Sequence, residues 1–438
     1  MGNFAKTDTK KIIIDTLIVL LHITYGMSML KVWLLDILPI PNYLDLAIIT
    51  TIAFFLRFGG EFKLLTIKNN GFILLFFALY FADILQGFQF GFKASLFRFF
   101  MLVDIYLFME YIYAIYIEKR KKTANPISGI TVHFELFSAY NIAAIALCAL
   151  LIFFHVISPY SNPLPLNSLI SNNDLVGANY YFPGHLSLTS GSMRGLVSSN
   201  IPVLTGLTHE PHVLFYLIGP CFFFLLFRVK NSMWKVLLLY FLYFSILIIS
   251  TSVTALISFI IVIVVEQLYN IVIGKGKTKN IIILIIVLSL LSWFMSIGKE
   301  IVDDVTLLMT NRISAGNDEG SKGFSFSMLM YIFSPSSLFG SGNMPGATGF
   351  ELDNINIGYL SCVLDVIFII IFVVKMFKNI ISFDRSIHYC GLATLYFFLH
   401  TQKMGVQTFN FQYLSYYVIL LLILDKEREQ KHEFSIIQ

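Results

Sequence analysis

Glu210 is the side chain best placed to act as a base. It lies in Thr205-Gly-Leu-Thr-His-Glu210-Pro, directly before an apolar run at 211–227. Pro211 suits the first turn of a helix and Thr208 suits its N-cap, so Glu210 would lie where helix amides favour an anion. Partial burial would make this carboxylate a stronger base, whereas the helix dipole and a nearby arginine would weaken it. The sequence leaves open whether Glu210 is a base or only a capping carboxylate.

Three arginines are candidate ligands for an anionic substrate. Arg194 is the only lysine or arginine between residues 158 and 209, and Arg312 lies in a second long polar stretch. Arg98 lies within an apolar run, where a charge is expensive unless it is paired or faces a cavity. The planar guanidinium binds phosphate oxygens with two parallel hydrogen bonds. Arg98 suits a structural pair with Asp83 or Asp104 equally well.

Two further side chains near these groups have more than one interpretation. His209, beside Glu210, is a candidate second base or metal ligand. Isolated histidines at a membrane interface are commoner than metal sites, and the four cysteines all lie in apolar runs, so no metal site is predicted. Tyr181 could stack on a sugar or anchor the chain at the membrane interface. Prolines and asparagines around it predict irregular structure.

The composition shows which elements must position these residues. Hydrophobic residues make up 57% of the chain, charged residues 13%, and the mean hydropathy is +0.78, which excludes a water-soluble globule. A membrane-spanning helix needs about 20 mostly apolar residues. The sequence therefore predicts an all-α polytopic membrane protein whose spans are centred near residues 22, 50, 80, 106, 147, 220, 242, 262, 289, 367, 394 and 417. The spans centred near 242 and 262 require residues 236–272 to fold back at Ser250-Thr-Ser252.

The distribution of lysine and arginine orients these twelve predicted spans. With both termini in the cytoplasm, 22 of the 30 lysines and arginines fall on the cytoplasmic face. This arrangement predicts a single transmembrane domain over 1–438, with long periplasmic loops at 158–209 and 298–355. The basic face indicates contact with membrane lipids and no nucleic-acid partner. The cytoplasmic connections are too short for a catalytic domain that uses nucleotide-activated substrates.

Several short motifs together resemble one family of membrane enzymes. They are Arg194, Gly206-Leu-Thr-His-Glu-Pro211, Leu247-Ile-Ile-Ser-Thr-Ser-Val-Thr254, Leu338-Phe-Gly-Ser-Gly342 and Asn354. With the predicted spans and loops, they resemble the bacterial O-antigen (oligosaccharide repeat unit) polymerase family, Wzy. This family is similar in architecture to the C-type glycosyltransferases. Asp353-Asn354 stands where a His-Asn pair is expected of an O-antigen ligase, which favours the polymerase.

The resemblance implies a reaction at the outer face of the bacterial inner membrane. The donor would be a glycan on undecaprenyl diphosphate, and the acceptor a second lipid-linked repeat unit, without cofactor or metal. Glu210 would be the catalytic base. The implied substrate-binding residues, for diphosphate or sugar, are Arg194, Arg312, Arg98, His209, Asn354 and Tyr181. The resemblance also implies a separate chain-length regulator as a partner.

Three other functions remain alternatives. A lipid-linked oligosaccharide flippase could use charges around a central cavity, although internal repeats typical of transporters are not evident in the sequence. An O-antigen ligase would transfer the finished chain to the lipid A core. A membrane acyltransferase would modify the glycan without changing its length.

Overall fold

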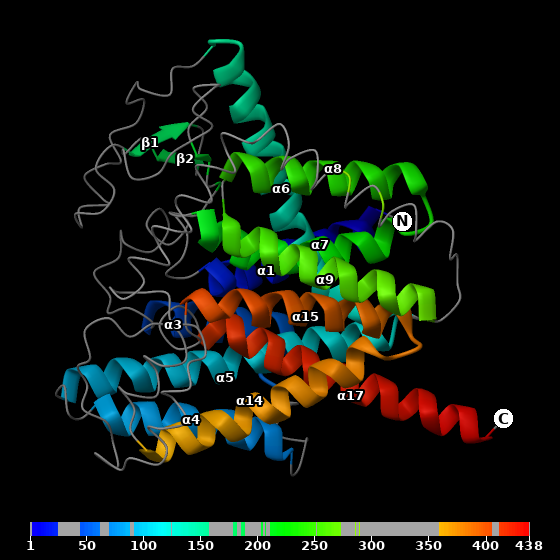
Figure 1. The fold of residues 1–438 in the computed structure, drawn as a ribbon. Helices are drawn as coiled ribbons and strands as arrows, with labels where there is room; N and C mark the ends of the chain where they lie inside the picture. Colours follow the sequence, from blue (N-terminus) through cyan, green and yellow to red (C-terminus); the bar gives the residue numbers. More distant parts are fainter. Residues whose placement is uncertain are drawn as a thin grey trace.

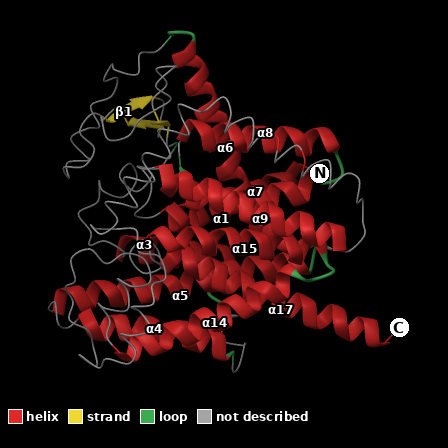
Figure 2. Ribbon diagram, viewed as in Figure 1, coloured by secondary structure: helices red, strands yellow, loops and turns green. Residues whose placement is uncertain are grey.

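The helical architecture expected from the sequence is confirmed in the computed structural model (Figures 1 and 2). The structure describes residues 2–24, 44–61, 70–87, 92–123, 125–156, 178–181, 185–188, 203–204, 206, 211–250, 252–272, 285, 289, 359–404 and 411–437. Within these ranges, Arg98–Arg120, Ile127–Phe153 and Thr254–Val272 are long and apolar enough to cross a membrane. The chain is therefore a membrane protein, and the full set of twelve spans stays a prediction.

Described helices cover eleven of the twelve predicted span centres. In the first half of the chain they are α1 (Gly2–Thr24), α3 (Leu44–Phe58), α4 (Gly71–Gly87), α5 (Phe92–Arg120) and α6 (Ile127–Phe153). The later helices are α7 (Pro211–Val229), α8 (Met233–Ser250), α9 (Val253–Val272), α14 (Tyr359–Ile380), α15 (Arg385–Met404) and α17 (Phe411–Ile437). The predicted reversal after Ser250 is confirmed, because α8 ends there and α9 begins three residues later. The predicted span near residue 289 lies largely outside the described residues.

Ion pairs gather helix ends at one end of the bundle, here called the basic end. Arg228 at the end of α7 pairs with Glu135 of α6, and Lys375 of α14 pairs with Asp425 of α17. The first and last helices both reach α5 near its C-terminal end. Lys11 of α1 pairs with Glu118 at 3.5 Å, and Tyr116 donates a 2.6 Å hydrogen bond to Glu427 of α17. Both termini thus lie at one end of the bundle (Figure 1), and the compartment that this end faces stays a prediction.

A small antiparallel sheet lies at the opposite end, here called the sheet end (Figure 2). Its strands are β1 (Ala178–Tyr181), β2 (His185–Leu188) and β3 (Val203–Leu204), in the order β1-β2-β3. The expectation of wholly irregular structure in this predicted loop was therefore wrong. The pair Tyr180-Tyr181 favours a strand, and Pro183-Gly184 is a turn signal between the first two strands. The third strand contacts α8, which ties the sheet to the bundle.

Close packing of α7 against α15 holds the centre of the bundle. A Cβ atom at Gly219 would lie 2.0 Å from Cε1 of Tyr396, so only glycine allows this approach. The two helices make the most extensive helix contact among the described elements. Because α15 lies between other helices (Figure 1), it buries polar residues such as Thr394 and Thr401. Because these positions face protein and not lipid, α15 can be less apolar than α7, α9 and α14, which it contacts.

Large apolar side chains cover much of the outside of the bundle. Leu56 is 78% exposed, Leu74 64% and Phe241 65%. Exposed apolar surface of this kind fits contact with lipid and would be a liability in water.

Candidate functional site

Most of the predicted outer site lies outside the described residues. Glu210, His209, Arg194, Arg312 and Asn354 all belong to this undescribed part. The backbone of Tyr181 lies in β1, where it pairs with His185, and its side chain is outside the description. The grouping of these residues around one substrate therefore stays a prediction.

Arg98 is the one predicted site residue whose side chain the structure describes. It lies in the first third of α5, toward the sheet end, and it is partly buried. Of its two expected partners, Asp104 contacts His22 and Thr50 as described below, and the side chain of Asp83 lies outside the described residues.

Gly206 lies close to α6 and α7, shortly before α7 begins. Its φ is +59°, a left-handed conformation that favours glycine. A Cβ atom here would lie 2.4 Å from Oδ1 of Asn141 in α6 and 3.2 Å from a methyl group of Leu214 in α7. The helix then begins at Pro211, as the sequence predicted. Gly206 and Pro211 are therefore the two residues of this motif that the structure places, and Glu210 lies between them outside the described residues.

A buried polar cluster joins α1, α3 and α5 within the bundle. His22 Nε2 lies 3.1 Å from Asp104 Oδ1, and the hydroxyl of Thr50 donates to the same oxygen at 3.0 Å. The other ring nitrogen of His22 lies 2.6 Å from the carbonyl oxygen of Ile18, and the ring stacks on Phe108. All three polar residues are fully buried. The sequence signalled Asp104 as an acid inside an apolar run, but it did not identify its partners.

Glu266 of α9 accepts hydrogen bonds from several donors and was missed in the sequence analysis. Tyr389 donates at 2.9 Å, Tyr240 at 3.1 Å and Gln267 at 2.9 Å, and a longer bond comes from Asn270 at 3.4 Å. An acid in the middle of an apolar run was the available signal. Its donors come from α8, α9 and α15, so the cluster fixes their mutual positions.

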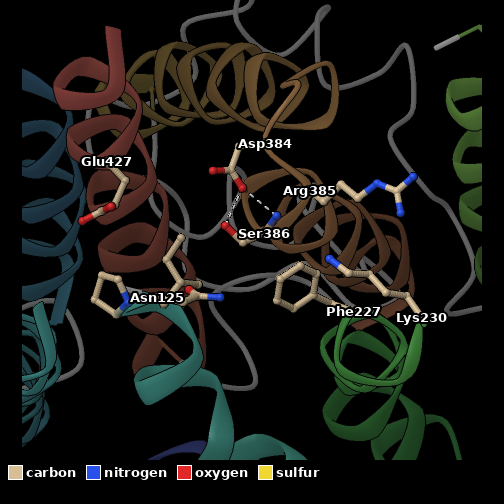
Figure 3. Close-up of a pocket in the computed structure, with 9 residues that line it drawn as sticks. Asn125, Phe227, Lys230, Asp384, Arg385, Ser386 and Glu427 are labelled. Atoms are coloured by element: carbon tan, nitrogen blue, oxygen red, sulfur yellow. Dashed lines mark hydrogen bonds between the residues drawn. The ribbon is translucent and has the colours of Figure 1, made fainter. Parts of the chain in front are cut away.

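A cavity of about 220 Å³ opens at the basic end, and Figure 3 shows the residues that line it. It lies where the ends of α6, α7 and α15 meet the side of α17. Its lining residues are Asn125, Pro126, Ile127, Phe227, Lys230, Asp384, Arg385, Ser386 and Glu427. From the sequence, Lys230 and Arg385 were assigned to membrane topology and to general contact with membrane lipids, without a specific site. The lining residues come together only through packing, because Asn125 and Glu427 are more than 250 residues apart in the chain.

Metal-binding geometry is absent from the described residues. They contain no group of three or more histidine, cysteine, aspartate or glutamate side chains that could hold a metal ion. Cys148, Cys221 and Cys390 are buried free thiols.

Comparison of the chain with protein-family models, with curated proteins and with solved structures finds no match.

Proposed function

We propose that this protein is a membrane glycosyltransferase that polymerises lipid-linked oligosaccharides, as O-antigen polymerases do. The proposal rests on the sequence motif 205–211, whose described residues are the left-handed Gly206, close to Asn141, and Pro211, the first residue of α7. A catalytic carboxylate on a loop requires fixed neighbours, and Gly206 and Pro211 would supply them for Glu210. Its location at the end away from the basic end agrees with chemistry at the outer face of a bacterial inner membrane.

The proposed reaction needs one base and fixed positive charge. The acceptor hydroxyl oxygen attacks the anomeric carbon of the donor sugar, and its proton passes to Glu210. The bond from that carbon to the diphosphate oxygen breaks with its electron pair, and undecaprenyl diphosphate leaves. Arg194, Arg312 and Arg98 would stabilise the charge that develops on the departing diphosphate. His209, Asn354 and Tyr181 would contact the sugars.

The test is the length of the surface glycan in a strain that lacks this gene. We expect the deletion to leave only the core with a single repeat unit, and the wild-type gene to restore the ladder. Glu210→Gln and Arg194→Ala should fail to restore it at normal membrane levels. Glu61→Gln is the matched control, because Glu61 is an exposed carboxylate just beyond α3 at the basic end. Normal polymerisation by Glu210→Gln would refute the base assignment.

The same gel separates the other functions. Repeat units that never reach the core would indicate a flippase or a ligase, and a glycan of normal length with altered mass would indicate an acyltransferase.

A further inference from the structure

The size of the cavity at the basic end limits what it can hold. Its volume is about 220 Å³, smaller than the roughly 300–1,000 Å³ typical of pockets for drug-sized ligands. A phosphate or a lipid headgroup fits this space, whereas a lipid-linked oligosaccharide does not.

The two acids that line the cavity are engaged by the protein itself. Asp384 Oδ1 accepts hydrogen bonds from the backbone amide of Ser386 at 2.8 Å and from its hydroxyl at 2.6 Å, which caps the start of α15. Glu427 accepts the hydroxyl of Tyr116 at 2.6 Å and lies 3.8 Å from Nε of Arg120. Figure 3 shows Glu427 on the opposite side of the cavity from the two cations.

The two cations lie close enough to repel each other. Burial lowers the pKa of Lys230, the positive charge of Arg385 lowers it further, and Asp384 acts in the opposite sense. The ammonium group of Lys230 also lies 3.8 Å from the ring centre of Phe227. A bound anion would therefore offset both the repulsion between the cations and the loss of hydration at Lys230.

Exposed aromatic side chains mark the depth of the cavity in the membrane. Trp234, four residues after Lys230, is 83% exposed, and Phe383, two residues before Arg385, is 88% exposed. Aromatic residues of this kind concentrate at the level of the lipid headgroups. Basic pockets between helix ends at this level bind phospholipid headgroups.

From the cavity, its two cations and its flanking aromatics, we infer that this is a binding site for the phosphate group of an anionic phospholipid. Lys230 donates to the phosphate oxygens, and Arg385 does so after a change of rotamer, because Figure 3 shows its guanidinium turned away from Ser386 and Asn125 on the same lining. None of the lining residues belongs to the proposed catalytic loops, so the site stands or falls independently of the proposed function.

The test is lipid binding by the purified full-length protein in detergent, followed by native mass spectrometry. Phosphatidylglycerol is the probe. Phosphatidylcholine, which has a phosphate but no net charge, is the comparison lipid. We expect one phosphatidylglycerol to remain bound to the wild type. Lys230→Gln and Arg385→Gln should each weaken its retention about tenfold, the change expected for loss of about 1.4 kcal/mol of charge-assisted hydrogen bonding.

Two variants control for charge and folding. Lys235→Gln removes an exposed lysine from the same end, outside the cavity lining, and should retain the lipid. Lys230→Arg keeps the positive charge and should retain at least about half of the wild-type binding of phosphatidylglycerol. Equal retention by Lys230→Gln and the wild type would overturn the site, as would equal losses in Lys230→Gln and Lys235→Gln.

Inorganic phosphate distinguishes the source of the anion. Failure of millimolar phosphate to displace the lipid supports a headgroup site. Displacement of phosphatidylglycerol by phosphate, together with phosphate-dependent thermal stabilisation lost in Lys230→Gln, would show a site for a soluble anion and overturn the lipid assignment.

Discussion

Replacing Arg57 with methionine should destabilise the bundle far more than replacing any exposed cation nearby. The side chains of Arg57 and Asp15 are both 4% exposed. Arg57 binds Asp15 with two hydrogen bonds, Nε to Oδ1 at 3.0 Å and Nη2 to Oδ2 at 3.2 Å, and it also bonds Glu118 at 2.5 Å. This arginine therefore joins α1, α3 and α5.

The expected cost depends on which acid loses its partners. Without Arg57, Glu118 keeps Lys122 at 2.9 Å and Lys11 at 3.5 Å. Asp15 keeps only the hydroxyl of Tyr111 at 2.8 Å among its described contacts, and it is left as a buried charge. Removal of one partner from a buried ion pair costs about 3–5 kcal/mol. Lys122→Met removes a lysine just beyond the end of α5 whose side chain is 56% exposed, and exposed pairs of this kind contribute about 0.2–1 kcal/mol.

The assay is unfolding of the purified protein in mixed micelles of rising sodium dodecyl sulfate content, followed by circular dichroism. We expect Arg57→Met to unfold at a much lower fraction of sodium dodecyl sulfate than Lys122→Met. Adding Asp15→Asn to Arg57→Met should recover about 2 kcal/mol, because it removes the stranded charge. Two results would refute this reasoning: a free energy of unfolding for Arg57→Met within about 1 kcal/mol of that for Lys122→Met, or no recovery of stability in the double variant.

Three further outcomes are expected. Gly206→Ala should lower the free energy of unfolding by roughly 1–2 kcal/mol through the left-handed backbone alone, measured by the same unfolding assay. Adding Asn141→Ser should recover only the further loss caused by the clash with Asn141. Gly219→Ala should lower the free energy of unfolding by about 1–3 kcal/mol through overpacking, and adding Tyr396→Leu should recover part of this loss. Unchanged stability of Gly219→Ala would contradict the close packing of α7 and α15. Phosphatidylglycerol binding should weaken as pH rises through the lowered pKa of Lys230, because the ammonium group then loses its proton. At pH values between the lowered pKa of folded Lys230 and the ordinary lysine pKa, the unfolded chain holds more protons than the folded protein. The free energy of unfolding therefore rises with pH in this range. Lys230→Arg should abolish the pH dependence of binding, and an unchanged dependence would assign it to another group.

The helical fold could be predicted because its signal is local. A run of about 20 apolar residues must form a helix in lipid, where each backbone polar group needs an internal partner. The reversal after Ser250 followed from length alone, since residues 236–272 are too long for one span. The short strands around Tyr181 were missed, because their pairing is weak in any single segment and depends on β3, which lies more than 20 residues further along the chain.

The candidate sites divide in a similar way. The motif ending at Glu210 and Pro211 was visible as a polar sequence before an apolar run, and its role remains the proposal argued above. The partners of Glu266, by contrast, come from α8, α9 and α15, and no spacing in the sequence connects Tyr240 with Tyr389.

The amino-acid sequence by itself determined that this chain enters a membrane, where along the chain most of its helices are centred, and which ends carry the basic residues. These properties follow from hydropathy and from charges placed along each segment. Only the tertiary structure decided that Lys230 and Arg385 share one cavity, that Arg57 joins three helices, and that Gly206 lies against Asn141. Such contacts depend on how helices distant in sequence pack side by side, and packing is a property of the whole bundle.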